Sequence, residues 1–154
     1  MRLEPGQPAP GFELEGPDGQ RHRLDEFLQR GPALVYFYPK ADTPGCTAQA
    51  LGLQGILDDI GTTSVVGISP DPPARLGKFR DKYGLVFSLL SDPDHAVAEA
   101  YGVWVERSMY GRRYMGIERS AFLVGGDGSL EQVWYKVSPK ATATNLTKAL
   151  AAGG

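Results

Sequence analysis

Short apolar or β-branched runs bounded by glycine, proline or aspartate alternate along the chain with segments whose apolar residues recur at helical spacing. The runs predict strands at Gly11–Leu14, Gln20–Leu24, Ala33–Tyr38, Thr63–Ser69, Phe87–Leu90, Ser120–Val124 and Leu130–Val137. The helical spacing predicts helices at Asp25–Arg30, from about Pro44 to Ile60, around Leu76, Phe79 and Tyr83, at Asp94–Tyr101 and at Thr142–Ala152. Two of the strands, Ala33–Tyr38 and Thr63–Ser69, are apolar or β-branched nearly throughout, which is typical of buried strands.

Turn signals divide these elements into a recognisable order. Two hairpins are predicted by the turn signals Pro17-Asp18-Gly19 and Gly125-Gly126-Asp127-Gly128. The three prolines within residues 1–10 predict an extended arm. The segment Gly102–Gly116 is interpreted as a loop. The order is a hairpin, then β-α-β-α-β-α, then an antiparallel hairpin and a closing helix. This order predicts one α/β domain over residues 1–154, a thioredoxin-like sandwich with an N-terminal hairpin extension.

The stretch from Tyr36 to Thr47 carries the clearest chemical signal. The strand ends at Pro39, and Thr43 followed by Pro44 is a helix-start signal, with Thr43 as N-cap and Pro44 at the first helical position. Cys46 then takes the third helical position, where free backbone N–H groups and the helix dipole favour a thiolate. In open α/β sheets, sites lie at the carboxyl ends of the strands, and Cys46 is placed there.

Composition and charge exclude several classes of protein. The 154 residues carry a net charge of −2 with both signs interspersed, which does not fit a nucleic-acid binder. The apolar runs are too short to span a bilayer, and the N-terminus shows no apolar segment of a secretory signal. Cys46 is the only cysteine, so no intrachain disulfide forms, which is typical of a reducing cytosol. We therefore expect a soluble, cytoplasmic protein without membrane or nucleic-acid partners.

The segment Pro39-Lys40-Ala41-Asp42-Thr43-Pro44-Gly45-Cys46 resembles the Pro-x-x-x-Thr-Pro-x-Cys signature of peroxiredoxins. Three further stretches are similar to the peroxiredoxin Q, or bacterioferritin comigratory protein, branch: Gly67–Asp71, Tyr101–Trp104 and Gly116–Leu123. The resemblance runs from about residue 6 to residue 150. It is specific, because the motifs are separate and stand in the right order.

The resemblance implies a role for each matching residue. Cys46 is implied as the peroxidatic cysteine that attacks the O–O bond, and Arg119 as the group that stabilises the thiolate and the charge developing on oxygen. The Thr43 hydroxyl is implied to bond the peroxide or the thiolate, so that Thr43, Gly45, Cys46 and Arg119 contact the substrate, while Pro39 shields the pocket from water. A guanidinium suits this chemistry, because it is always charged and presents a fixed fork of donors.

Three positions depart from the family pattern. Many members of the branch have a resolving cysteine five residues after the peroxidatic one, where this chain has Leu51, and others have one at the position matched to Ala98. The chain therefore resembles a one-cysteine peroxiredoxin, whose sulfenic acid is reduced by an external thiol such as thioredoxin, glutaredoxin or a small thiol. The third departure is Gln49 in place of a common Glu, which removes a negative charge and predicts a less rigidly held arginine.

Several of these residues also have ordinary structural explanations. Lone cysteines are often buried hydrophobes, an N-cap alone explains Thr43, and Pro39 ends a strand in any case. Arg119 opens an apolar strand, whereas Arg112 and Arg113 are interpreted as solvated.

Other polar and aromatic residues point to structure rather than to a ligand. No metal site or cofactor is predicted, because His22 and His95 show no ligand spacing and Ser91 or Asp92 suits a helix cap. Trp104, Tyr110 and Tyr114 are interpreted as core or loop packing, with a cover for the pocket or a partner surface as the alternative.

Two functions remain open at this point. The first is a thiol-dependent peroxidase, a monomer that reduces hydrogen peroxide and organic hydroperoxides through Cys46. The alternative is a peroxide-sensing redox or binding module with slow or no turnover, which the missing resolving cysteine motivates. A disulfide oxidoreductase within one chain is excluded, because that chemistry needs a second cysteine.

Overall fold

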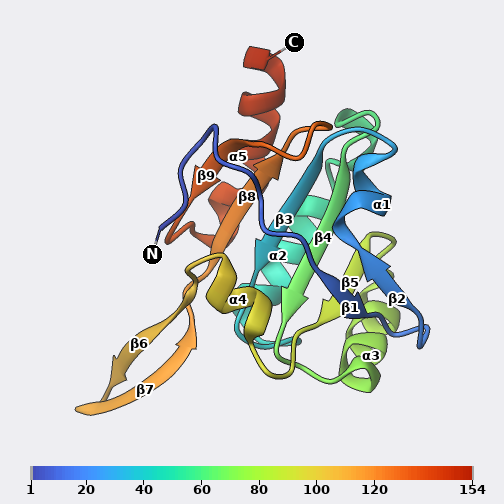
Figure 1. The fold of residues 1–154 in the computed structure, drawn as a ribbon. Helices are drawn as coiled ribbons and strands as arrows, with labels where there is room; N and C mark the ends of the chain where they lie inside the picture. Colours follow the sequence, from blue (N-terminus) through green and yellow to red (C-terminus); the bar gives the residue numbers. More distant parts are fainter. Residues whose placement is uncertain (1, 154) are drawn as a thin grey trace.

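The computed structural model describes residues 2–153, in which seven strands form one mixed sheet in the order β2-β1-β5-β4-β3-β8-β9 (Figure 1). The strands of this sheet are β1 (Glu13–Glu15), β2 (Arg21–Arg23), β3 (Ala33–Phe37), β4 (Ser64–Ser69), β5 (Ser88–Ser91), β8 (Ser120–Val124) and β9 (Leu130–Trp134). β3, β4 and β5 run parallel, whereas β8 is antiparallel to β3 and β9 is antiparallel to β8. The β-α-β-α-β-α order followed by an antiparallel hairpin agrees with the sequence prediction.

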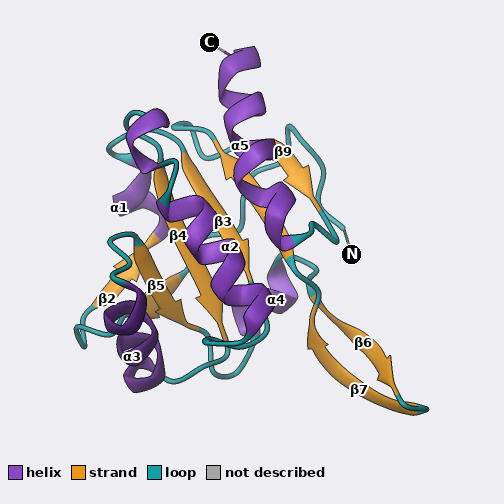
Figure 2. Cartoon of the chain, turned by 180° about the vertical axis from the view of Figure 1, so that it is seen from behind, coloured by secondary structure: helices purple, strands orange, loops and turns teal. Residues whose placement is uncertain are grey.

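Helices cover both faces of this sheet. The helices are α1 (Leu24–Leu28), α2 (Pro44–Gln54), α3 (Pro73–Tyr83), α4 (Ala96–Ala100) and α5 (Pro139–Gly153). Figure 2 shows α2, α3 and α5 in front of the strands, and Figure 1 shows α4 on the opposite face. No helix within residues 2–153 has the length and apolarity needed to cross a membrane.

The central strand β3 contributes side chains to both apolar layers, because its side chains alternate between the two faces of the sheet. Tyr36 and Tyr38 point into the layer shared with α2, α3 and α5, and Val35 and Phe37 point into the layer shared with α1 and α4. All five residues of β3 are buried, as the apolar sequence predicts. The strand ends beside the first turn of α2, so Cys46 lies at the carboxyl edge of the parallel strands.

Helix α2 is shorter than predicted. It ends at Gln54 rather than Ile60, and a separate 3₁₀ turn, Leu57–Asp59, follows. Gly55 is the C-terminal cap. A Cβ on Gly52 would lie 3.9 Å from Cβ of Ala143 on α5, an ordinary van der Waals distance, so the packing of α2 on α5 does not require this glycine.

The interpretation of Gly102–Gly116 as a loop is wrong. Two strands, β6 (Trp104–Met109) and β7 (Arg112–Ile117), form a separate two-stranded sheet that stands away from the rest of the molecule (Figures 1 and 2). Tyr110 and Gly111 connect them and both have positive φ angles, 52° and 78°, as a two-residue type I′ turn requires. This turn signal was present in the sequence, but the glycines and charges around it concealed the alternation.

The β6–β7 hairpin packs against the rest of the protein at its base, and its side chains near the turn are exposed to solvent. The ring of Trp104 stacks on that of His95 with centroids 3.8 Å apart, and Ile117 is buried. Met109, Tyr110, Tyr114 and Met115 are exposed, Tyr110 to 98%. The prediction that the Tyr110 ring packs in the core or against a loop is therefore wrong.

The remaining differences concern element ends. Helix α5 begins at Pro139 rather than Thr142, strand β9 stops at Trp134, and α4 begins at Ala96 rather than Asp94. The predicted N-terminal arm, apart from residue 1, which lies outside the described residues, runs along β9 through an isolated bridge between Pro8 and Ser129. Gly6 N–H also donates to the carbonyl oxygen of Leu130, at 2.8 Å.

Gly67 allows the sheet to hold a tyrosine over its surface. Gly67 pairs with Tyr36 across β3 and β4, and a Cβ on Gly67 would lie 2.9 Å from the Tyr36 hydroxyl oxygen. The Tyr36 ring cannot move aside easily, because it packs against Tyr38 and Phe87. We expect Gly67→Ala to lower the free energy of unfolding by about 1–3 kcal/mol through overpacking, measured by urea denaturation.

Gly77→Ala is the matched control, because a Cβ at this helical position meets only Pro17, at 3.5 Å. This variant should be neutral or stabilising by up to about 1 kcal/mol. Equal stability of the two variants would contradict the packing explanation.

Candidate active site

Cys46 is the third residue of α2, and its side chain is buried, with 1% of its surface exposed. Thr43 is the N-cap residue with an extended backbone, and Pro44 opens the helix, as predicted. The Thr43 hydroxyl does not cap the first turn but donates to the carbonyl oxygen of Lys40 at 2.8 Å. The first turn of α2 therefore has no side-chain cap from Thr43, and its N–H groups have no partner within the helix.

Arg119 reaches Cys46 from the segment between β7 and β8. Its Nη2 donates to Sγ of Cys46 at 3.4 Å, so the structure brings together the two residues that the sequence placed 73 positions apart. A Cβ on Gly45 would lie 3.1 Å from the same Nη2, which means that glycine at this position leaves room for the guanidinium. The resulting pair places a positive charge directly beside the only thiol of the chain.

Gln49 holds the other side of the guanidinium. Arg119 Nη1 donates to Oε1 of Gln49 at 2.7 Å, and Gln49 Nε2 donates to Oγ1 of Thr142 at 2.9 Å. Thr142 in turn donates to the carbonyl oxygen of Ser138 at 2.9 Å. Because Gln49 and Thr142 are both buried, this chain of bonds fixes the arginine through α2 and α5. Gln49 thus does bond the arginine, and the prediction that it holds the arginine less rigidly than a glutamate would stays a prediction.

Sequence reasoning missed Thr142, which it placed only as the start of the last helix. No local motif marks this threonine, because its partner Gln49 lies 93 positions away. Helix position gives a partial signal: Thr142 follows Ser138 by one helical turn, and its hydroxyl bonds back to that carbonyl.

Pro39 lies at the surface, unlike Cys46. It lines a hollow of about 870 Å³ between the β3–α2 loop and α3, together with Lys40 and Asp42. The shielding role expected of Pro39 stays a prediction.

Asp42 ties the same loop to α3. Its carboxylate accepts a hydrogen bond from the Tyr83 hydroxyl at 2.7 Å and pairs with the Lys82 ammonium at 2.9 Å. Lys82 and then Tyr83 hold the pKa of Asp42 below its usual value, and Asp42 raises the pKa of Lys82.

The other polar residues considered from the sequence lie elsewhere. Arg112 and Arg113 are exposed on the β6–β7 hairpin, as predicted. His22 lies 3.2 Å from Asp18 in the N-terminal hairpin. Asp92 accepts hydrogen bonds from the N–H groups of Val97 and Ala98, which confirms its role as a helix cap.

A sequence profile of the AhpC/TSA family matches residues 5–133 of this chain. The chain belongs to the AhpC/TSA family. It is a peroxiredoxin, a thiol-dependent peroxidase with one cysteine, and curated relatives agree. Peroxiredoxin Bcp of Escherichia coli K12 is 48% identical over 134 residues, covering 86% of this chain and 85% of the relative. A putative peroxiredoxin of Mycobacterium tuberculosis, strain CDC 1551, is 44% identical over 151 residues, which cover 97% of this chain and 96% of the relative.

Solved structures of peroxiredoxins share the fold. Peroxidoxin BcpB of Mycobacterium tuberculosis superposes with a TM-score of 0.86 at 32% identity, covering 98% of each chain. A variant of Xanthomonas campestris peroxiredoxin Q superposes with a TM-score of 0.87 at 33% identity and covers 100% of this peroxiredoxin and 98% of that chain. These matches confirm the predicted thioredoxin-like peroxiredoxin fold.

The Xanthomonas campestris protein also shows what this peroxiredoxin lacks. It has been solved with one or the other of two cysteines replaced by serine. This chain has Cys46 alone, so it has no second cysteine to correspond to theirs.

Proposed function

We propose that Cys46 is the peroxidatic cysteine of this peroxiredoxin, and that the contact between Arg119 and its sulfur carries this assignment. The thiolate sulfur attacks one oxygen of the hydroperoxide and the O–O bond breaks. Cys46 becomes a sulfenic acid, and the other oxygen leaves with its electron pair and takes up a proton to give water or an alcohol. Arg119 Nη2, 3.4 Å from the sulfur, is placed to donate to the oxygens on which charge develops.

The neighbouring residues have supporting roles in this proposal. Gly45 admits the guanidinium and, with Cys46, presents the first-turn N–H groups of α2 to the peroxide. Thr43 presents a hydroxyl whose own proton is engaged by Lys40, so its oxygen is free to accept a hydrogen bond from the peroxide. Pro39 limits the access of water from the loop side.

The reduction of the sulfenic acid requires a thiol from another molecule, because Cys46 is the only cysteine. An incoming thiol displaces water and forms a mixed disulfide with Cys46, and a second thiol releases the reduced enzyme. We propose thioredoxin, glutaredoxin or a small thiol as the reductant, hydrogen peroxide or an organic hydroperoxide as the substrate, and a cytoplasmic monomer as the working form.

Steady-state turnover tests this proposal. The wild-type protein and Cys46→Ser are supplied separately with thioredoxin, glutaredoxin and dithiothreitol, and peroxide consumption is followed. Sustained turnover of the wild type with at least one of these thiols, absent from Cys46→Ser, supports the peroxidase. A single-turnover burst with no recycling by any of them would favour the peroxide-sensing alternative instead.

Gln49→Leu tests whether the arginine needs its second support. Leucine cannot accept from Arg119 Nη1 and leaves buried Thr142 without the amide. We expect the rate constant of the Cys46 thiol with hydrogen peroxide to fall about tenfold or more, because small misplacements of catalytic groups are costly. The free energy of unfolding should fall by about 1–3 kcal/mol, because Arg119 Nη1 loses its acceptor and the buried Thr142 oxygen loses its donor.

Gln54→Leu is the control for this substitution. Gln54 lies on the same helix but bonds Gly84 and Val86, away from Cys46. Its peroxide rate constant should equal that of the wild type. A wild-type rate constant in Gln49→Leu as well would remove Gln49 from the account.

A further inference from the structure

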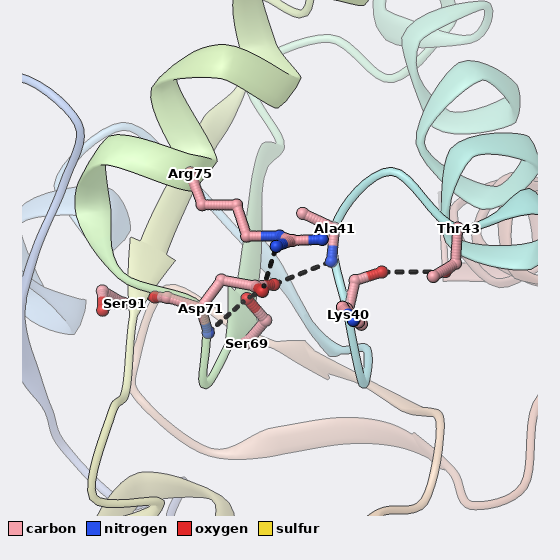
Figure 3. A network of polar contacts seen from close by, with 7 residues as sticks. All are labelled: Lys40, Ala41, Thr43, Ser69, Asp71, Arg75 and Ser91. Carbon is pink, nitrogen blue, oxygen red and sulfur yellow. Dashed lines mark hydrogen bonds and ion pairs between the residues drawn. The ribbon is translucent and has the colours of Figure 1, made fainter.

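A buried carboxylate outside the proposed catalytic set holds the loop that carries Thr43. Asp71 lies just after β4, in the segment before α3, and only 8% of its surface is exposed. Its Oδ2 accepts the backbone N–H of Ala41 at 2.7 Å and the hydroxyl of Ser69 at 2.8 Å (Figure 3). Because charge-assisted bonds to a buried carboxylate are stronger than neutral ones, the Ala41 contact is a firm attachment.

Asp71 is itself held from several directions. Nε of Arg75 pairs with Oδ1 at 3.3 Å, and the Ser91 hydroxyl donates to the backbone carbonyl oxygen of Asp71 at 2.6 Å. Figure 3 shows these groups converging on Asp71 from β4, β5 and α3, with Ala41 and Lys40 on the facing loop. The sheet therefore fixes the carboxylate, and the carboxylate fixes the loop.

The loop needs such an attachment, because its own backbone is strained. Asp42, directly after Ala41, has a φ of 61°, in a region that costs a residue other than glycine of order 1 kcal/mol or more. Such conformations persist where the surroundings determine them. Ala41 is held by Asp71, and the Asp42 side chain is held by Lys82 and Tyr83. The next residue, Thr43, starts α2 and thereby sets the position of Cys46.

We propose that Asp71 is a positioning residue for peroxide reduction: through the Ala41 N–H it sets the geometry of the Lys40–Thr43 loop and of the first turn of α2. Asp71 acts through the backbone and touches neither Cys46 nor the peroxide in this proposal. The inference rests on the proposed role of Cys46. It adds a residue that the peroxidatic signature around Cys46 does not include.

The test compares two reactions of the Cys46 thiol in Asp71→Ala. Reaction with hydrogen peroxide needs aligned donors around the sulfur, whereas alkylation by iodoacetamide needs the thiolate and access to it. We expect the peroxide rate constant to fall at least about tenfold, because misplaced catalytic groups lose alignment. Alkylation should stay within about threefold of the wild type or become faster, since thiol access does not need that alignment.

Asp71→Asn should recover most of the lost rate, because its amide oxygen can still accept from Ala41 N–H. Asp92→Ala is the matched control: Asp92 is also buried, and its side chain caps α4 through Val97 and Ala98 instead of bonding the catalytic loop. It should lower the melting temperature without changing the peroxide rate constant. If Asp71→Ala does not fold, Tyr83→Phe, which removes one of the two side-chain contacts that hold Asp42, should still slow the peroxide reaction more than alkylation.

A wild-type rate constant with hydrogen peroxide in Asp71→Ala would overturn the proposal. Equal losses of the peroxide and the iodoacetamide rate constants would overturn it as well. Where Asp71→Ala does not fold, a wild-type peroxide rate constant in Tyr83→Phe would do so. Failure of the underlying function is distinguishable, because the wild-type protein itself would then react no faster than a free thiol.

Discussion

Replacing Arg119 with alanine should reduce the rate constant of the Cys46 thiol with hydrogen peroxide by roughly 10²–10³-fold, the usual cost of losing a donor aimed at developing charge. The Nη2 atom is 3.4 Å from the sulfur, and within residues 2–153 no other arginine donates a hydrogen bond to this sulfur. The measurement is stopped-flow loss of the thiol under single-turnover conditions, without any reductant.

Arg119→Lys separates charge from geometry. The guanidinium bonds Gln49 with one nitrogen and Cys46 with another, and an ammonium cannot reproduce this planar fork. We therefore expect a loss well beyond tenfold, about 1.4 kcal/mol or more in activation free energy, although the charge is retained. Arg112→Ala removes the same charge from the exposed hairpin and should leave the rate constant unchanged. An unchanged rate in Arg119→Lys would show that the fork geometry is not used.

Excess peroxide without a thiol should convert the whole protein to the sulfinic acid at Cys46, a product that dithiothreitol does not reverse. The reason is the absence of a second cysteine: no internal thiol can trap the sulfenic acid before another peroxide reaches it. Mass spectrometry of the peptide that contains Cys46 is the proper measurement. The intact mass is ambiguous, because Met109 and Met115 are half exposed and also oxidise.

The control for this oxidation is the same peroxide treatment with dithiothreitol present from the start. The thiol should compete with the second oxidation and preserve activity. Recovery of only unmodified Cys46 after excess peroxide would contradict the prediction, because it would mean that the sulfenic acid does not form.

The strands of the main sheet could be predicted well, because the residues that indicate each strand lie within the strand or next to it. Ala33–Tyr38 is apolar throughout and Thr43-Pro44 is a start signal for α2, and both elements occur where they were expected. The β6–β7 hairpin was missed for a local reason as well: its charged strands are mostly exposed and lack a buried face, so the sequence shows little alternation of apolar and polar residues. Its two-residue turn at Tyr110-Gly111 was the feature that could have revealed it.

The same distinction between local and long-range features applies to the candidate active site. Cys46 and Thr43 follow from residue types and spacing, and Arg119 was found through a resemblance and then located 3.4 Å from the sulfur. The supports of these residues could not be predicted. Thr142 and Asp71 act on partners 93 and 30 positions away in the sequence, and only the packing of α5 against α2 and of β4 beside β3 brings them together.

The most direct test of the central claim mixes the reduced protein with one equivalent of hydrogen peroxide at neutral pH and follows loss of the Cys46 thiol in stopped flow. A small free thiol is measured in parallel. The account predicts that the protein reacts orders of magnitude faster than the free thiol, because Arg119 and the helix N-terminus place hydrogen-bond donors where charge develops on the oxygens of the peroxide. Reaction no faster than the free thiol would contradict it: the arrangement around Cys46 would be present without the peroxide chemistry.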